Sequence, residues 1–147
     1  MKPSFYFMIF LFLSACSISP KEINYGSDLC DYCKMTIVDK QHSAKLVTKK
    51  GKAYLFDAIE CMLPFKKENP EKVAALLLVA DYQQPGQLIE AEQANYLISP
   101  SIPSPMGAYL SAFTSDKAIK AIQAEKGGKI FSYKDLENQF LKNDINR

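Results

Sequence analysis

Cys30, Cys33 and Met35 place three sulfur-containing side chains within six residues, spaced as Cys-x-x-Cys-x-Met. If residues 33–35 are extended, Cys33 and Met35 lie on the same face of a strand, since strand side chains alternate with a period of two. Thiolate and thioether sulfurs are soft donors that suit copper(I). Structural zinc prefers four cysteine, histidine or carboxylate ligands, and no second Cys-x-x-Cys or His-x-x-x-His pair is present. The cluster therefore predicts a copper(I) site.

Met106 is a second sulfur donor, far downstream in a proline-rich loop. The loop contains Pro100, Pro103 and Pro105, and Gly107 follows the methionine. The prolines restrict the backbone, so the loop could hold the Met106 side chain out as a ligand. Methionine also fills gaps in hydrophobic cores, and the residues alone favour this second interpretation.

Two further positions could contribute donors. Cys61 and Met62 are adjacent, so their side chains on a helix point about 100° apart. They stand close to Ile59 and Phe65, which favours packing in the core over metal binding. His42, the only histidine, is expected to be a solvated loop residue, with a role as a fourth donor left open.

The elements that must position these residues are short strands with a few helices between them. Strands are expected where short apolar or β-branched runs end at turn residues, as at the Lys49–Gly51 hairpin. Asp57 with Glu60 three residues later predicts a helix start, and Pro64 should kink or end that helix early. The run 74–82 is ambiguous, but the nearby Pro85 and Gly86 favour a strand. The expected strands are 33–38, 43–48, 52–56, 74–82, 95–99, 108–113 and 129–133, and the later helices are 116–125, ending at Gly127–Gly128, and 134–142.

A faint internal repeat supports an α+β fold. Residues 51–60 align without gaps on residues 128–137, and both copies are expected to run from a strand into a helix. We predict one compact domain of two similar small strand-strand-helix units, covering about 30–82 and 95–142.

The N-terminus predicts a lipoprotein signal peptide. Lys2 precedes an apolar run over residues 5–13, which ends at Leu-Ser-Ala-Cys with Cys16 last. The run is shorter than the roughly 20 residues of a transmembrane helix, so we expect cleavage after residue 15 and lipid attachment at Cys16. A plain secretory peptide is the alternative. Residues 16–29 would form a tether, and residues 30–142 the exported, membrane-anchored domain.

Net charge and hydrophobic content argue against nucleic-acid binding and against a disordered chain. Removing residues 1–15 leaves 132 residues with a formal charge of +1, since only Lys2 is lost from the +2 of the whole chain. A charge this small, without a block of like charges, excludes an electrostatic basis for nucleic-acid binding. A hydrophobic content of 48% indicates a folded globular domain rather than a disordered one.

The chain resembles the NosL family, accessory lipoproteins of nitrous oxide reductase. The resemblance rests on the Cys33-x-Met35 pair, on Pro105-Met106-Gly107 with Ala112-Phe113, and on the Leu-Ser-Ala-Cys lipobox that ends at Cys16. The resemblance spans nearly the whole mature chain. It implies a periplasmic copper(I) chaperone of denitrification that supplies the reductase and works with an ABC-type transporter. It implies Cys33, Met35 and Met106 as copper ligands, whereas Cys30 could be a ligand, a redox partner or neither. It also implies a duplicated α+β fold related to organomercurial lyases.

Two other functions compete with copper binding. Cys30 and Cys33 could act as a thiol-disulfide redox pair, because Cys-x-x-Cys in an oxidising compartment can be a redox motif. The motif is not expected to open a helix, so it would lack the helix N-terminus that lowers a thiol pKa. An enzyme like organomercurial lyase rests on fold analogy alone, which is a poor guide to chemistry. We therefore expect a binding protein and not an enzyme.

Overall fold

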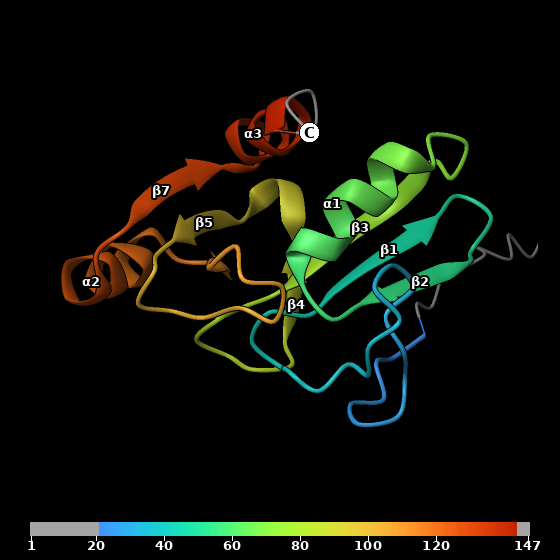
Figure 1. The fold of residues 1–147 in the computed structure, drawn as a ribbon, viewed down its shortest axis with the longest axis horizontal. Coiled ribbons are helices and arrows are strands. Elements are labelled where there is room, and N and C mark those ends of the chain that lie inside the picture. Colours follow the sequence, from blue (N-terminus) through green and yellow to red (C-terminus); the bar gives the residue numbers. More distant parts are fainter. Residues whose placement is uncertain (1–20, 144–147) are drawn as a thin grey trace, which may run out of the picture.

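The computed structural model describes residues 21–143, and the predicted signal peptide and Cys16 lie outside this range. The helices are interspersed among the strands along the chain, as Figure 1 shows. Their bounds are β1 Ala44–Thr48, β2 Ala53–Phe56, α1 Ile59–Glu68, β3 Ala74–Ala80, β4 Leu88–Glu90, the 3₁₀ helix η1 Ala91–Gln93, β5 Asn95–Ile98, β6 Leu110–Phe113, α2 Asp116–Lys126, β7 Lys129–Ser132 and α3 Tyr133–Asn143.

The strands form two antiparallel sheets, one of order β2-β1-β3-β4 and one of order β6-β5-β7. Helix α1 packs against β1 and β2 of the first sheet, and α2 packs against the second, as Figure 1 shows. The predicted α+β class is confirmed. The repeat noticed in the sequence corresponds to β2 followed by α1 and to β7 followed by α3.

The two sheets are joined through the core. Asp81, just after β3, forms a parallel bridge to Ala112 in β6, and the backbone N–H of Tyr82 donates to the Ala112 carbonyl at 2.8 Å. Buried side chains from both sheets form one continuous cluster that includes Phe56 and Tyr96. The two sheets therefore share a hydrophobic core.

The hairpin between β1 and β2 forms as predicted. Gly51 has a φ of 83°, which glycine adopts without a steric penalty. The Gly51 N–H donates to the Thr48 carbonyl at 2.9 Å. The resulting register places Lys45 opposite Leu55.

Helix α1 differs from the prediction at both its start and its end. Its N-cap is Ala58, and no side chain caps it, so the expected capping role of Asp57 is wrong. Pro64 lies inside the helix, which continues to Glu68. Proline removes one helical hydrogen bond, but the ring of Phe65 packs 4.8 Å from that of Tyr54. Burial of this face of the helix offsets the lost bond.

The predicted strand 33–38 is also wrong. The only pairing in this region is an isolated bridge between Leu29 and Thr36. Lys34 has a φ of 66°, which is incompatible with extended backbone. Cys33 and Met35 therefore belong to a turn, and the alternation argument that placed them on one face does not apply. Strand β4 and η1 were not predicted, because β4 has only three residues.

His42 is not the solvated loop residue that the sequence indicated, since only 2% of its surface is exposed. Its Nδ1 lies 2.7 Å from a carboxylate oxygen of Asp39, and its Nε2 lies 3.1 Å from the hydroxyl oxygen of Ser111. A carboxylate only accepts, so Nδ1 donates to Asp39, while Nε2 is in hydrogen-bond contact with the Ser111 hydroxyl. Both ring nitrogens are thus engaged, which argues against His42 as a metal donor.

Some residues of the segment predicted as a tether contact the domain. The Tyr25 and Ser43 hydroxyls lie 2.8 Å apart, and the Lys45 ammonium donates to the Lys21 carbonyl. Ile23 packs against the core. Within residues 21–143, none of the helices combines the length and the apolar character needed to cross a bilayer.

Candidate metal-binding site

Residues 30–35 form a compact turn with internal hydrogen bonds. The Cys30 N–H donates to the Met35 carbonyl at 2.8 Å, and the Lys34 N–H donates to the Cys30 carbonyl at 3.0 Å. The Cys33 N–H points to the sulfur of Cys30 at 3.4 Å. These contacts hold the two thiols of the predicted Cys-x-x-Cys pair on one side of the turn before any ligand arrives.

Asp31 ties this turn to strand β2. Its backbone N–H donates to the Leu55 carbonyl at 2.8 Å, and its carboxylate accepts from the Leu55 N–H at 2.7 Å. Strand β2 ends at Phe56 and leads after two residues into α1. The turn is therefore fixed next to the first turn of α1, which carries Cys61.

Three thiols converge at this place. The sulfur atoms of Cys30, Cys33 and Cys61 all lie within 4.8 Å of one another. Cys30 and Cys61 are fully buried, and Cys33 is partly exposed. Cys61 is packed in the core as predicted, but its sulfur also belongs to the thiol cluster, which sequence reasoning missed. Across residues 21–143, no other group of three cysteine, histidine or carboxylate side chains converges in this way.

Hydrogen bonding and burial shift the pKa values of the three thiols in different directions. The pKa of Cys30 is lowered to about 5, chiefly because the Cys61 thiol donates to its sulfur, with smaller contributions from backbone N–H groups. The pKa of Cys61 is raised, because its proton is held by Cys30 and because it is buried. Burial also raises the pKa of Cys33. A lowered pKa at Cys30 favours the thiolate, the form of cysteine that binds metals.

The two predicted methionine ligands are both exposed, Met35 by 54% and Met106 by 42%. Met106 is therefore not a core residue, and the interpretation that the residues alone favoured is wrong. Met62, by contrast, is fully buried as predicted. Exposed methionines are uncommon because the side chain is apolar.

The loop that carries Met106 is anchored to α1. The Ser104 hydroxyl donates to the carboxylate of Glu60 and accepts from the Tyr109 N–H at 2.9 Å. Glu60 is 7% exposed, and its second carboxylate oxygen has no hydrogen-bond partner among the described residues. Because Glu60 and Cys61 are neighbours in the first turn of α1, the same turn contacts the thiol cluster and the methionine loop.

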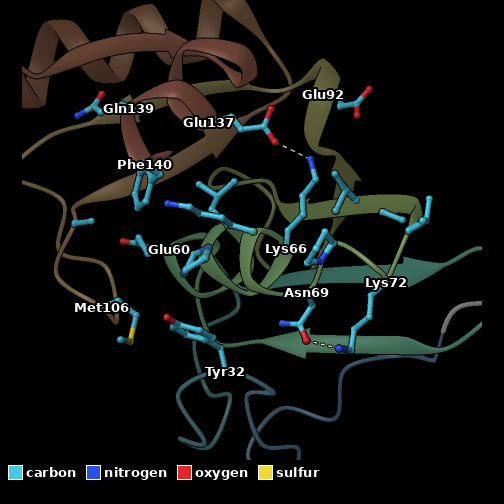
Figure 2. Close-up of a pocket in the computed structure, with 18 of the residues that line it drawn as sticks. Tyr32, Glu60, Lys66, Asn69, Lys72, Glu92, Met106, Glu137, Gln139 and Phe140 are labelled. Carbon is cyan, nitrogen blue, oxygen red and sulfur yellow. Dashed lines mark hydrogen bonds and ion pairs between the residues drawn. The ribbon is translucent and has the colours of Figure 1, made fainter. Parts of the chain in front are cut away.

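Met106 lines a groove of about 840 Å³ together with Tyr32 and Glu60. Figure 2 shows these three side chains at one end of the groove, and Phe140 above them. Further along, the Lys66 ammonium lies 2.6 Å from the Glu137 carboxylate. Since Tyr32 directly precedes Cys33, the turn and the methionine loop border the same depression although they are about 70 residues apart in sequence.

Comparisons with known proteins agree on one family. The sequence model of the NosL family matches residues 20–141. The copper-binding lipoprotein NosL of Stutzerimonas stutzeri is 26% identical over 125 residues, covering 80% of this chain and 66% of that protein, so this chain spans slightly less than two thirds of that relative. The crystal structure of the copper chaperone NosL from Shewanella denitrificans matches with a TM-score of 0.69 at 22% identity, covering 81% of this chain and 96% of that one. The structural match establishes the shared fold.

Proposed function

Because this chain belongs to the NosL family, we propose that it is a lipid-anchored chaperone that binds copper(I) and delivers it to an exported copper enzyme. Nitrous oxide reductase is the proposed client, and an ABC-type transporter is a proposed membrane partner. The two relatives are described as a copper-binding lipoprotein and a copper chaperone, which supports copper as the cargo. Neither description is that of an enzyme.

The proposed ligands are Cys33, Met35, Met106 and Cys30. The observation that carries the proposal is the convergence of the Cys30 and Cys33 thiols within 4.8 Å in a hydrogen-bonded turn. Thiolates neutralise the cation, and thioethers add weak, exchangeable donors that a client can displace one at a time. A carrier requires this combination, because copper must be retained in transit and released on contact.

The proposal is tested by metal competition on the purified full-length chain. Copper(I), titrated against a chromophoric chelator under reducing conditions, should bind stoichiometrically and more tightly than zinc by orders of magnitude, because the donors are soft. Comparable affinities for the two metals would contradict copper(I) carriage.

The proposed anchor is Cys16, at the end of the predicted signal peptide. Cys16→Ala should abolish lipid modification and release the protein from the membrane, since two acyl chains give stable attachment. The measurement is the distribution between membrane pellet and supernatant after a high-salt wash, which removes electrostatically bound protein. A variant that stays in the pellet would overturn Cys16 as the anchor. The anchored domain is proposed to lie on the exported side of the membrane, in the periplasm or at the cell surface.

A thiol-disulfide exchange function remains the alternative, because the convergent Cys30 and Cys33 sulfurs could also form a disulfide. The two functions differ in a direct assay. A copper carrier retains copper(I) and exchanges slowly with a disulfide reporter, whereas a redox protein does the reverse. We favour the carrier, because the exposed Met35 and Met106 have no role in disulfide exchange.

A further inference from the structure

Cys61 is the cluster thiol that no proposed ligand set includes. It lies in the first turn of α1, fully buried, with its sulfur within 4.8 Å of those of Cys30 and Cys33. A cysteine that merely filled the core would not need its sulfur directed at two others.

The spacing of the three sulfurs fits one metal ion. Sulfur ligands at about 2.3 Å from a common metal, in a trigonal plane, lie about 4.0 Å from one another. The three sulfurs are within 4.8 Å, so each pair needs to approach by less than about 1 Å. Copper(I) accepts three soft donors, whereas zinc would require a fourth.

The backbone around the cluster is arranged for negatively charged sulfur. The Cys33 N–H points to the sulfur of Cys30 at 3.4 Å. Cys61 sits at the N-terminal end of α1, where the helix dipole favours negative charge. Both features lower the cost of gathering thiolates around a single positive charge.

The methionines differ from the thiols in exposure. Met35 is 54% and Met106 is 42% exposed, whereas Cys30 and Cys61 are fully buried. Cys33, partly exposed, lies between the two environments. The soft donors thus form a buried group of thiols and an exposed group of thioethers.

We infer that Cys61 is a third thiolate ligand, and that copper(I) rests in a buried position formed by Cys30, Cys33 and Cys61. The exposed Met35 and Met106 then serve entry and transfer, with Cys33 common to both positions. Each coordinating thiol releases its proton to solvent, and copper stays in the monovalent state throughout. The inference rests on the proposed copper carriage and assigns its resting ligands.

The decisive measurement is the number of sulfur neighbours of bound copper(I), from X-ray absorption at the copper edge, without thiol reductants. The parent and the double variant Met35→Leu, Met106→Leu should both show three short copper–sulfur distances. Both methionines are exposed, so the double variant should fold normally. A double variant with two or fewer sulfur neighbours would overturn the inference.

Cys61→Ser provides the complementary arm. It should lose one sulfur neighbour and bind copper(I) more weakly by about tenfold or more, because hydroxyl oxygen is a hard donor. Met62→Leu is the matched control, since Met62 is the next residue of α1 and equally buried, and it should change neither quantity. Unchanged affinity in folded Cys61→Ser would refute the inference. If Cys61→Ser fails to fold, the sulfur count of the double methionine variant decides.

The outcomes separate this inference from the proposed function. A parent that retains no copper(I) contradicts copper carriage itself. A parent that retains copper through the methionines, with Cys61→Ser behaving like the parent, contradicts only the buried three-thiolate position.

Discussion

Cys33 is the one residue that belongs to every arrangement of ligands considered for the copper site. It pairs with Cys30 in the turn, lies within reach of the Cys61 sulfur, and is the thiol of the Cys-x-Met motif. Cys33 is also partly exposed, unlike its two buried neighbours, so it is the cluster cysteine nearest to an incoming donor from solvent.

Replacing Cys33 should therefore weaken copper(I) binding more than replacing either methionine. Cys33→Ser removes an anionic soft donor and should lower the affinity by more than about tenfold, whereas Met35→Ala and Met106→Ala should each lower it by less than about tenfold. The affinities are compared against a chromophoric chelator, and melting curves control for folding. Cys33→Ser binding like the parent would place the site elsewhere in the chain.

Helix α1 and the loop between β5 and β6 act together at the element scale. The hydrogen bond from Ser104 to Glu60 attaches the loop to the helix turn that carries Cys61. Because Ser104 also accepts from the Tyr109 N–H, one hydroxyl both shapes the loop and fixes its position. The position of Met106 thus depends on contacts to α1 as well as on the loop's own prolines.

Removing the Ser104 hydroxyl should affect copper(I) binding only through the position of Met106. We expect Ser104→Ala to lower copper(I) affinity modestly, by less than about tenfold, since a loosened loop presents its thioether less often. The same substitution in a Met106→Ala background should have no further effect, as in a double-mutant cycle. Ser101→Ala, an exposed position in the same loop, is the control. Additive losses from Ser104→Ala and Met106→Ala would contradict the coupling.

Two adjacent glycines between α2 and β7, Gly127 and Gly128, differ in how closely their backbone approaches neighbouring residues. Gly127 and Gly128 both have positive φ values, but a Cβ on Gly128 would clash with the Ile98 carbonyl oxygen, whereas one on Gly127 would meet nothing within 4 Å. Gly128→Ala should destabilise the fold by about 1–3 kcal/mol more than Gly127→Ala. Thermal or denaturant unfolding of both variants measures the difference, and equal losses would show that the backbone strain alone matters.

At the scale of the whole molecule, a buried polar link supplements the apolar core. His42 joins Asp39 to Ser111, which lies in β6 of the second sheet. Burial raises the pKa of Asp39, but hydrogen bonds with His42 and with the Gln41 N–H lower it below 3.8. The ionised carboxylate is thus favoured by the folded state.

This link predicts an acid-dependent loss of stability. A carboxyl whose folded pKa lies below its unfolded pKa stabilises the fold above the unfolded value, and this contribution is lost as the pH falls through the folded value. The melting temperature of the parent should exceed that of Asp39→Asn at about pH 5. The gap should narrow as the pH falls through 3.8 and below. A gap that widens on acidification would show that the sign of the shift is wrong.

The sequence by itself determined the elements whose signals are local. The hairpin at Gly51, the ambiguous run that became β3, and the end of α2 at Gly127 were predicted and are confirmed, because turn chemistry and apolar runs act over a few residues. The pairing of Cys30 with Cys33 also follows from spacing alone. These features need no knowledge of distant contacts.

Only the tertiary structure decided which distant residues meet. Cys61 joins Cys30 because Asp31 attaches the turn to β2, and Met106 borders the same groove as Tyr32 because Ser104 binds Glu60. Pro64 stays in its helix, and His42 is buried, because packing energy outweighs local preference. Contacts between residues far apart in sequence arise from packing of the whole chain, and no local pattern specifies them.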